Sequence, residues 1–137
     1  MATLTLPNRV ESVRPATAFL VQAARALNVP AATEPVFEVA VSEAIANAIK
    51  HGRGGRKDAT IRCDIELKGK RLTLRILDSG TGFRLRNVPL PKPSRQRPEA
   101  LPEAGYGLPI IRAVFPIVRV IEENGRFGVE LGMPVRR

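Results

Sequence analysis

The segment that most constrains the fold is residues 37–52, FEVAVSEAIANAIKHG, which belong to a helix predicted to run from residue 34 to about residue 51. One face of this helix is apolar and suited to packing on a sheet, and it carries Phe37, Val41, Ala44, Ile45 and Ala48. Glu43 and Asn47 lie one turn apart on a second face. That face also holds apolar neighbours, namely Val36, Val39, Ala40 and Ala46. We therefore expect a helix with two covered faces and a polar pair that needs a partner.

Two interpretations of the polar pair remain open. In the structural one, Glu43 is an exposed carboxylate and Asn47 is a poor helix former without a local role. In the functional one, Asn47 is an oxygen ligand for Mg²⁺, which favours few protein ligands beside phosphate oxygens. Glu43 would then orient or deprotonate the group that attacks the phosphate.

The other predicted elements surround this helix in a regular order. Thr33 is the predicted N-cap of the helix, with Pro35 in its first turn. Helical spacing and alternation predict an edge strand over 3–6, a helix over 14–27, strands over 59–67 and 71–77, a helix from 105 to 115, and strands over 117–121 and 127–133. This order predicts one domain over residues 1–137, an α+β two-layer sandwich whose mostly antiparallel sheet has its helices on one face.

Two glycine-containing turns carry the remaining candidate chemistry. The sequence DSGTGF at residues 78–83 directly follows a predicted strand. It is either a plain turn or a place where glycine lets a ligand approach the backbone, with the Asp78 carboxylate accepting from a purine amino group. Gly105 and Gly107 open the last helix, either as a hinge or as an anion site at a helix start.

Charge and composition limit the partners. The net charge of +9 predicts an acidic partner. Tyr106 offers no aromatic stacking platform and the basic residues are scattered, so we do not expect direct nucleic-acid binding. The sequence contains no apolar run of roughly 18 residues and begins without a signal-peptide pattern, so we expect a cytoplasmic protein without membrane binding. The one cysteine, Cys63, is read as an apolar filler in a strand.

Taken together, three motifs resemble the ATP-binding domain of the GHKL superfamily, which includes gyrase-type ATPases and histidine kinases. They are Glu43-x-x-x-Asn47, Asp78-x-Gly80-x-Gly82-Phe83 and Gly105-x-Gly107-Leu108-x-Ile110-Ile111, and they agree in order, spacing and element type. The resemblance covers residues 34–133. The small size and the phrase SEAIANAIKHG make the chain most similar to the stand-alone anti-sigma-factor serine/threonine kinases of bacteria.

The resemblance implies the Bergerat ATP-binding fold, with ATP and Mg²⁺ as cofactors. Residues 84–104, which hold five prolines and five basic residues, would form a mobile lid. Asn47 would hold Mg²⁺, Asp78 would bind the adenine amino group, Gly82 would line the base pocket, and Gly105 and Gly107 would meet the phosphates. The full expected cofactor-binding set is Asn47, Asp78, Gly80, Gly82, Gly105, Gly107 and Leu108.

The resemblance also implies partners and a catalytic residue. Glu43 would be the base that activates a serine on an anti-sigma-factor antagonist, and the kinase would sequester a sigma factor until that antagonist competes. Such kinases commonly work as homodimers. A non-catalytic binding module of the same fold, with ATP used structurally or not at all, remains the alternative. The chain departs from the family at residues 126–129, which read RFGV where a threonine is usual, and at Pro109 inside the helix-opening motif.

Overall fold

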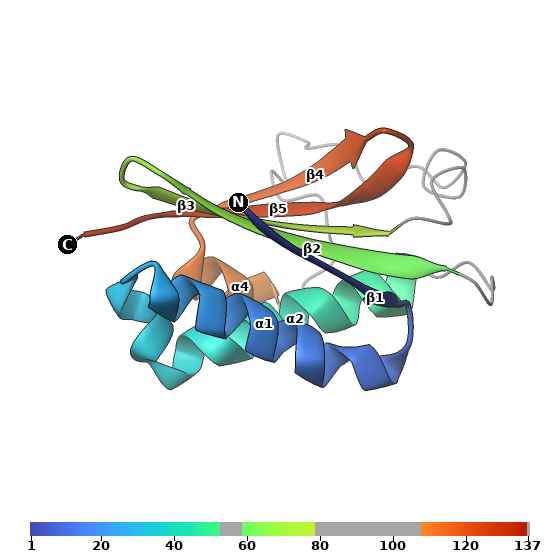
Figure 1. The fold of residues 1–137 in the computed structure, drawn as a ribbon, viewed down its shortest axis with the longest axis horizontal. Helices are drawn as coiled ribbons and strands as arrows, with labels where there is room; N and C mark the ends of the chain where they lie inside the picture. The colour runs from blue at the N-terminus through green and yellow to red at the C-terminus, as the bar shows by residue number, and fades with distance from the viewer. Residues whose placement is uncertain (53–58, 79–107, 137) are drawn as a thin grey trace.

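The protein is built as two layers, a sheet and a layer of helices that covers one of its faces (Figure 1). The computed structural model describes residues 1–52, 59–78 and 108–136. Within these residues the predicted α+β sandwich, with an antiparallel sheet and helices on one face, is confirmed. None of the helices in the described ranges is long and apolar enough to cross a bilayer.

Among the residues described, the sheet has five strands in the order β1-β2-β3-β5-β4, and each neighbouring pair is antiparallel. The strands are β1 (Ala2–Pro7), β2 (Thr60–Lys68), β3 (Arg71–Asp78), β4 (Ile117–Glu123) and β5 (Arg126–Pro134). β1 is an edge strand, as its ending at Pro7 predicts. The order places β3, and therefore Asp78 at its end, at the centre of the sheet.

Both hairpin turns follow from residues that accept a positive φ. Gly69, between β2 and β3, has φ +59°. Asn124 and Gly125, between β4 and β5, have φ +53° and +80°, as an Asn-Gly hairpin turn requires. Both turns lie between strands that the sequence predicts, and they set the register that decides which side chains face the helices.

In the described part of the chain, three α-helices and two 3₁₀ turns make the second layer. They are η1 (Val10–Ser12), α1 (Val13–Ala26), η2 (Pro30–Thr33), α2 (Pro35–Gly52) and α4 (Leu108–Val114). The predicted N-cap at Thr33 is wrong. Its hydroxyl donates to the Pro30 carbonyl at 2.8 Å within η2, and α2 begins at Pro35, so the extended Glu34 takes the N-cap position.

The core lies between α1, α2, α4 and the covered face of the sheet. The predicted apolar face of α2 is confirmed, because Phe37, Val41 and Ile45 are fully buried. The second face of α2 is more open than we expected, because Val36 and Val39 are 44% and 45% exposed. α2 is therefore covered by the sheet on one side and reaches the surface near its start.

Gly128 explains part of the departure at residues 126–129. It lies on β5 opposite Leu77 of β3. A Cβ built at this position would lie 1.8 Å from the Ile76 carbonyl oxygen, a distance that no side chain could occupy. The two central strands thus approach too closely for threonine, or for any residue but glycine, at position 128.

Candidate functional site

Helix α2 presents Glu43 and Asn47 one turn apart, and both side chains are half-buried. α2 lies between α1 and α4 and also packs on β3 and β5. Asn47 also interacts with another group of the protein. A half-buried carboxamide in this layer is the environment that the functional interpretation of the pair requires.

Glu43 borders an open groove on the surface of α2. The groove has a volume of about 420 Å³ and is lined by Arg25, Thr33, Pro35, Glu38, Val39, Ser42 and Glu43. Arg25 is anchored there because its Nε donates to the Ala32 carbonyl at 2.9 Å. Glu43 therefore lies on the wall of a groove that is open to the surface.

Asp78 ends β3 on the side of the sheet that faces the helices. It follows Ile76 by two residues, and alternation puts both side chains on the same face. The residue is only 2% exposed. Asn8, which directly follows β1, donates from Nδ2 to Asp78 Oδ1 at 2.8 Å. A buried carboxylate is thus held at the end of the central strand, in the layer between the sheet and the helices.

Helix α4 is fixed beside α2 by an aromatic pair. The rings of Phe37 and Phe115 lie 5.5 Å apart at an interplanar angle of 51°. Phe115 follows the end of α4 and Phe37 lies near the start of α2, so the two helices run in opposite directions. With a rise of about 1.5 Å per residue, the buried Leu108 at the start of α4 lies beside the middle of α2. This is the part of α2 that carries Glu43 and Asn47.

Four expected site residues, Gly80, Gly82, Gly105 and Gly107, lie outside the described residues, as does the segment 84–104. The described members of the expected set are Glu43, Asn47, Asp78 and Leu108. Sequence reasoning missed two contributors. Asn8 reads as an ordinary residue after a strand-ending proline, and Arg25 reads as the exposed end of a helix. Neither carries a signal without knowledge of which strand ends meet.

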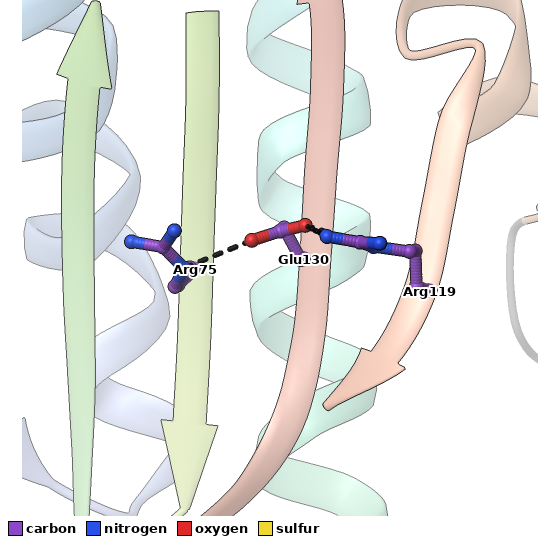
Figure 2. A network of polar contacts seen from close by, with 3 residues as sticks. All are labelled: Arg75, Arg119 and Glu130. Carbon is purple, nitrogen blue, oxygen red and sulfur yellow. Dashed lines mark hydrogen bonds and ion pairs between the residues drawn. The ribbon is translucent and has the colours of Figure 1, made fainter. Parts of the chain in front are cut away.

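The face of the sheet that no described helix covers, here called the open face, carries a separate polar network (Figure 2). Glu130 accepts from Arg75 Nε at 2.9 Å and from Arg119 Nε at 2.9 Å, and Arg119 Nη2 contacts it as well. Burial by itself would raise the pKa of Glu130, but the hydrogen bonds from Arg119 and Arg75 outweigh it and lower the pKa below its ordinary value. Beside this network, Arg62 Nε pairs with the buried Asp64 at 3.0 Å.

Comparison with known proteins adds independent findings. The model of the histidine kinase-like ATPase domain matches residues 6–133. The anti-sigma F factor of Clostridium beijerinckii is 30% identical over 88 residues, which cover 64% of this chain and 61% of the relative. The serine-protein kinase RsbW of Oceanobacillus iheyensis is 30% identical over 100 residues, which cover 71% of this chain and 61% of the relative. This chain thus spans about three fifths of the length of the curated relatives it matches.

Proposed function

Because the chain belongs to the histidine kinase-like ATPase family, we propose that it binds Mg²⁺ and ATP between α2 and the end of β3. We further propose that it phosphorylates a serine or threonine of a partner protein. The observation that carries the proposal is the buried Asp78 carboxylate at the end of the central strand, on the face that α2 covers. A buried carboxylate without a functional role is costly to retain.

The residues present fit a purine nucleotide. Asp78 is an acceptor at the end of a strand, and the amino group of adenine is a donor, so the two match in hydrogen-bonding type. Leu108, buried at the start of α4, supplies an apolar wall beside α2. The glycines at 80, 82, 105 and 107 complete this proposed set by their sequence positions.

Glu43 and Asn47 of α2 would have different roles at the phosphates. When bound, ATP supplies the phosphoryl group and Mg²⁺ offsets its charge. Asn47 would hold the cation through its carboxamide oxygen, which is the ligand type that Mg²⁺ accepts. Glu43 would take the proton of the attacking hydroxyl. Its place on an open groove supports this role, because a base for a protein substrate has to be reachable from outside.

The partners in this proposal follow from the names of the relatives, an anti-sigma F factor and a serine-protein kinase. We propose that the chain sequesters a sigma factor and phosphorylates the antagonist that competes for it. We also propose a homodimer. The resemblance to the anti-sigma-factor kinases, which commonly work as homodimers, supports this.

A binding module without phosphotransfer is the second candidate. The observation that favours it is the pair Val36 and Val39, two large apolar side chains that are exposed at the start of α2. Val39 also lines the groove at Glu43. Such side chains suit a protein contact, and a contact alone needs no catalytic base.

One experiment separates the two candidates. Proteins retained by the immobilised chain are incubated with radiolabelled ATP and Mg²⁺, and nucleotide affinity is measured in parallel by calorimetry. We expect Asn47→Ala to lose Mg²⁺-dependent ATP binding. We expect Glu43→Gln to bind ATP like the unmutated protein but to transfer phosphate about 10²- to 10⁴-fold more slowly, because a general base is missing.

Each outcome bears on one part of the proposal. Unchanged ATP affinity in Asn47→Ala would exclude Asn47 as the metal ligand. Transfer at the full rate by Glu43→Gln would exclude Glu43 as the base. If the unmutated protein retains its partners and binds ATP but transfers nothing, the binding module is the correct function.

A further inference from the structure

Asn8 connects two strand ends that are far apart in the sequence. Its backbone N–H donates to the Ala59 carbonyl at 2.9 Å, just before β2. Its side-chain Nδ2 donates to Asp78 Oδ1 at 2.8 Å, across 70 residues. The register explains how this is possible, because Pro7 lies opposite Thr60 and Ile61 lies opposite Asp78. The backbone of Asn8 thus lies beside the start of β2, and its side chain extends across β2 to the end of β3.

The chemistry of this contact fixes its direction. A carboxylate oxygen only accepts, so the amide must present its NH₂ group to Asp78. The other half of the amide then has no partner among the described residues, because Asn8 Oδ1 is buried and accepts no hydrogen bond there. A buried acceptor without a donor destabilises the folded protein. An amide with one atom unsatisfied among the described residues adds little to stability there, so its bond to Asp78 calls for another role.

We propose that Asn8 is a positioning residue for nucleotide recognition. It holds the Asp78 carboxylate in the rotation that accepts the 6-amino group of adenine, and it thereby sets the preference of the site for an amino-bearing purine. This inference rests on the proposed binding of ATP at Asp78. It adds the residue that follows β1 to a site that the three motifs place on α2, at the end of β3 and at the start of α4.

The test measures a preference as well as an affinity. Dissociation constants are determined for ATP and for purine riboside triphosphate, which differs only by lacking the 6-amino group. In the unmutated protein we expect ATP to bind more tightly. In Asn8→Ala we expect that preference to fall about fivefold to tenfold, the value of one oriented hydrogen bond. Affinity for the triphosphate without the amino group should stay within about twofold, since it makes no use of that bond.

Two further variants separate positioning from simple folding. Ser12→Ala is the matched control, because the Ser12 hydroxyl donates to the Pro7 carbonyl at 2.6 Å in the same junction and is not the donor to Asp78. It should leave the preference unchanged. Asn8→Ser keeps a polar side chain at the position but is too short to make the bond to Asp78. It should lose the preference like Asn8→Ala, and it carries the test if the alanine variant does not fold.

The failures of the inference and of the proposed function can be told apart. If the Asn8 variants keep the preference of the unmutated protein, or weaken both triphosphates equally, Asn8 is a structural tie and the inference is wrong while ATP binding stands. If the unmutated protein binds neither triphosphate, the proposed function fails and the inference fails with it. Loss of the preference in the Asn8 variants but not in Ser12→Ala supports the inference.

Discussion

Neighbouring residues on each strand point to opposite faces of the sheet, and the two faces differ in composition: one carries apolar rows and the other a charged row. On the covered face, Cys63, Ile76 and Val129 lie side by side in one row across β2, β3 and β5. One residue back on β3, and one ahead on β2 and β5, the neighbouring row on the open face is charged, with Asp64, Arg75 and Glu130 side by side. The helices cover the apolar rows, and the charged row is satisfied by its own members (Figure 2).

This difference gives a way to recognise the site. On the open face, a buried acid such as Glu130 has arginine partners and needs no other explanation. On the covered face, polar groups interrupt the apolar pattern where Asp78 ends β3 and where α2 presents Asn47. Local rules are most often broken at functional positions. A polar residue therefore means structure on one face and function on the other.

The largest effect is expected from a core substitution on the covered side. Phe115→Ala removes a fully buried ring and its contact with Phe37, so the free energy of unfolding should fall by about 3–5 kcal/mol. Urea denaturation followed by circular dichroism measures this. Ile110→Ala, on the exposed side of α4, is the control and should change stability by less than about 0.5 kcal/mol. Equal effects of the two variants would mean that α4 is not packed as described.

A smaller loss is expected on the open face. Glu130→Gln keeps the shape of the side chain but removes the charge to which Arg75 and Arg119 donate. We expect a loss of about 1–3 kcal/mol at neutral pH. Glu66→Gln, a half-buried acid on the same face of β2, is the matched control. If both variants cost the same, the network of Figure 2 adds nothing to stability.

The sign of the pH dependence follows from the lowered pKa of Glu130. A carboxyl whose pKa is lower in the folded protein contributes stability above its unfolded pKa, here 4.5, and loses it as the pH falls through the folded value. The difference between the unmutated protein and Glu130→Gln should therefore shrink below about pH 4.5 and vanish in stronger acid. A difference that stays constant from pH 7 to acid would assign the effect to packing.

The fold was readily predictable because its signals are local. Alternation in 59–67 and 71–77, the Asn-Gly turn and the apolar face of α2 each specify an element without reference to the rest of the chain. Thr33 failed as an N-cap because a 3₁₀ turn beginning at Pro30 competes for its hydroxyl. The hydrophobic pattern shows which residues are apolar, but it does not show which nearby backbone group a hydroxyl side chain will hydrogen-bond.

The site was only partly predictable, for a physical reason. Glu43 and Asn47 are visible in the sequence because they share one helix turn, and Asp78 because it ends a strand. Asn8 reaches Asp78 only because β1 lies beside β2 and β2 beside β3. A contact across 70 residues depends on strand order and register. Neither can be read from a short stretch of one sequence.

The smallest effect concerns Cys63, which lies one residue from the open-face Asp64 but on the covered face. Burial, and then the neighbouring Asp64 charge, raise the pKa of the thiol from 9.0 to about 12, so native Cys63 should resist thiol reagents at pH 8 and react after unfolding in urea. A group with a raised folded pKa contributes fully below its unfolded value and loses that contribution as the pH rises. Stability should thus decline between about pH 9 and 12 in the unmutated protein, and Cys63→Ala should lack this part of the decline. At pH 7 the substitution should cost only about 1 kcal/mol, because it removes one small buried atom.

Rapid labelling of the native protein would show that β2 opens from the sheet, and the division between the two faces would then not hold at this strand.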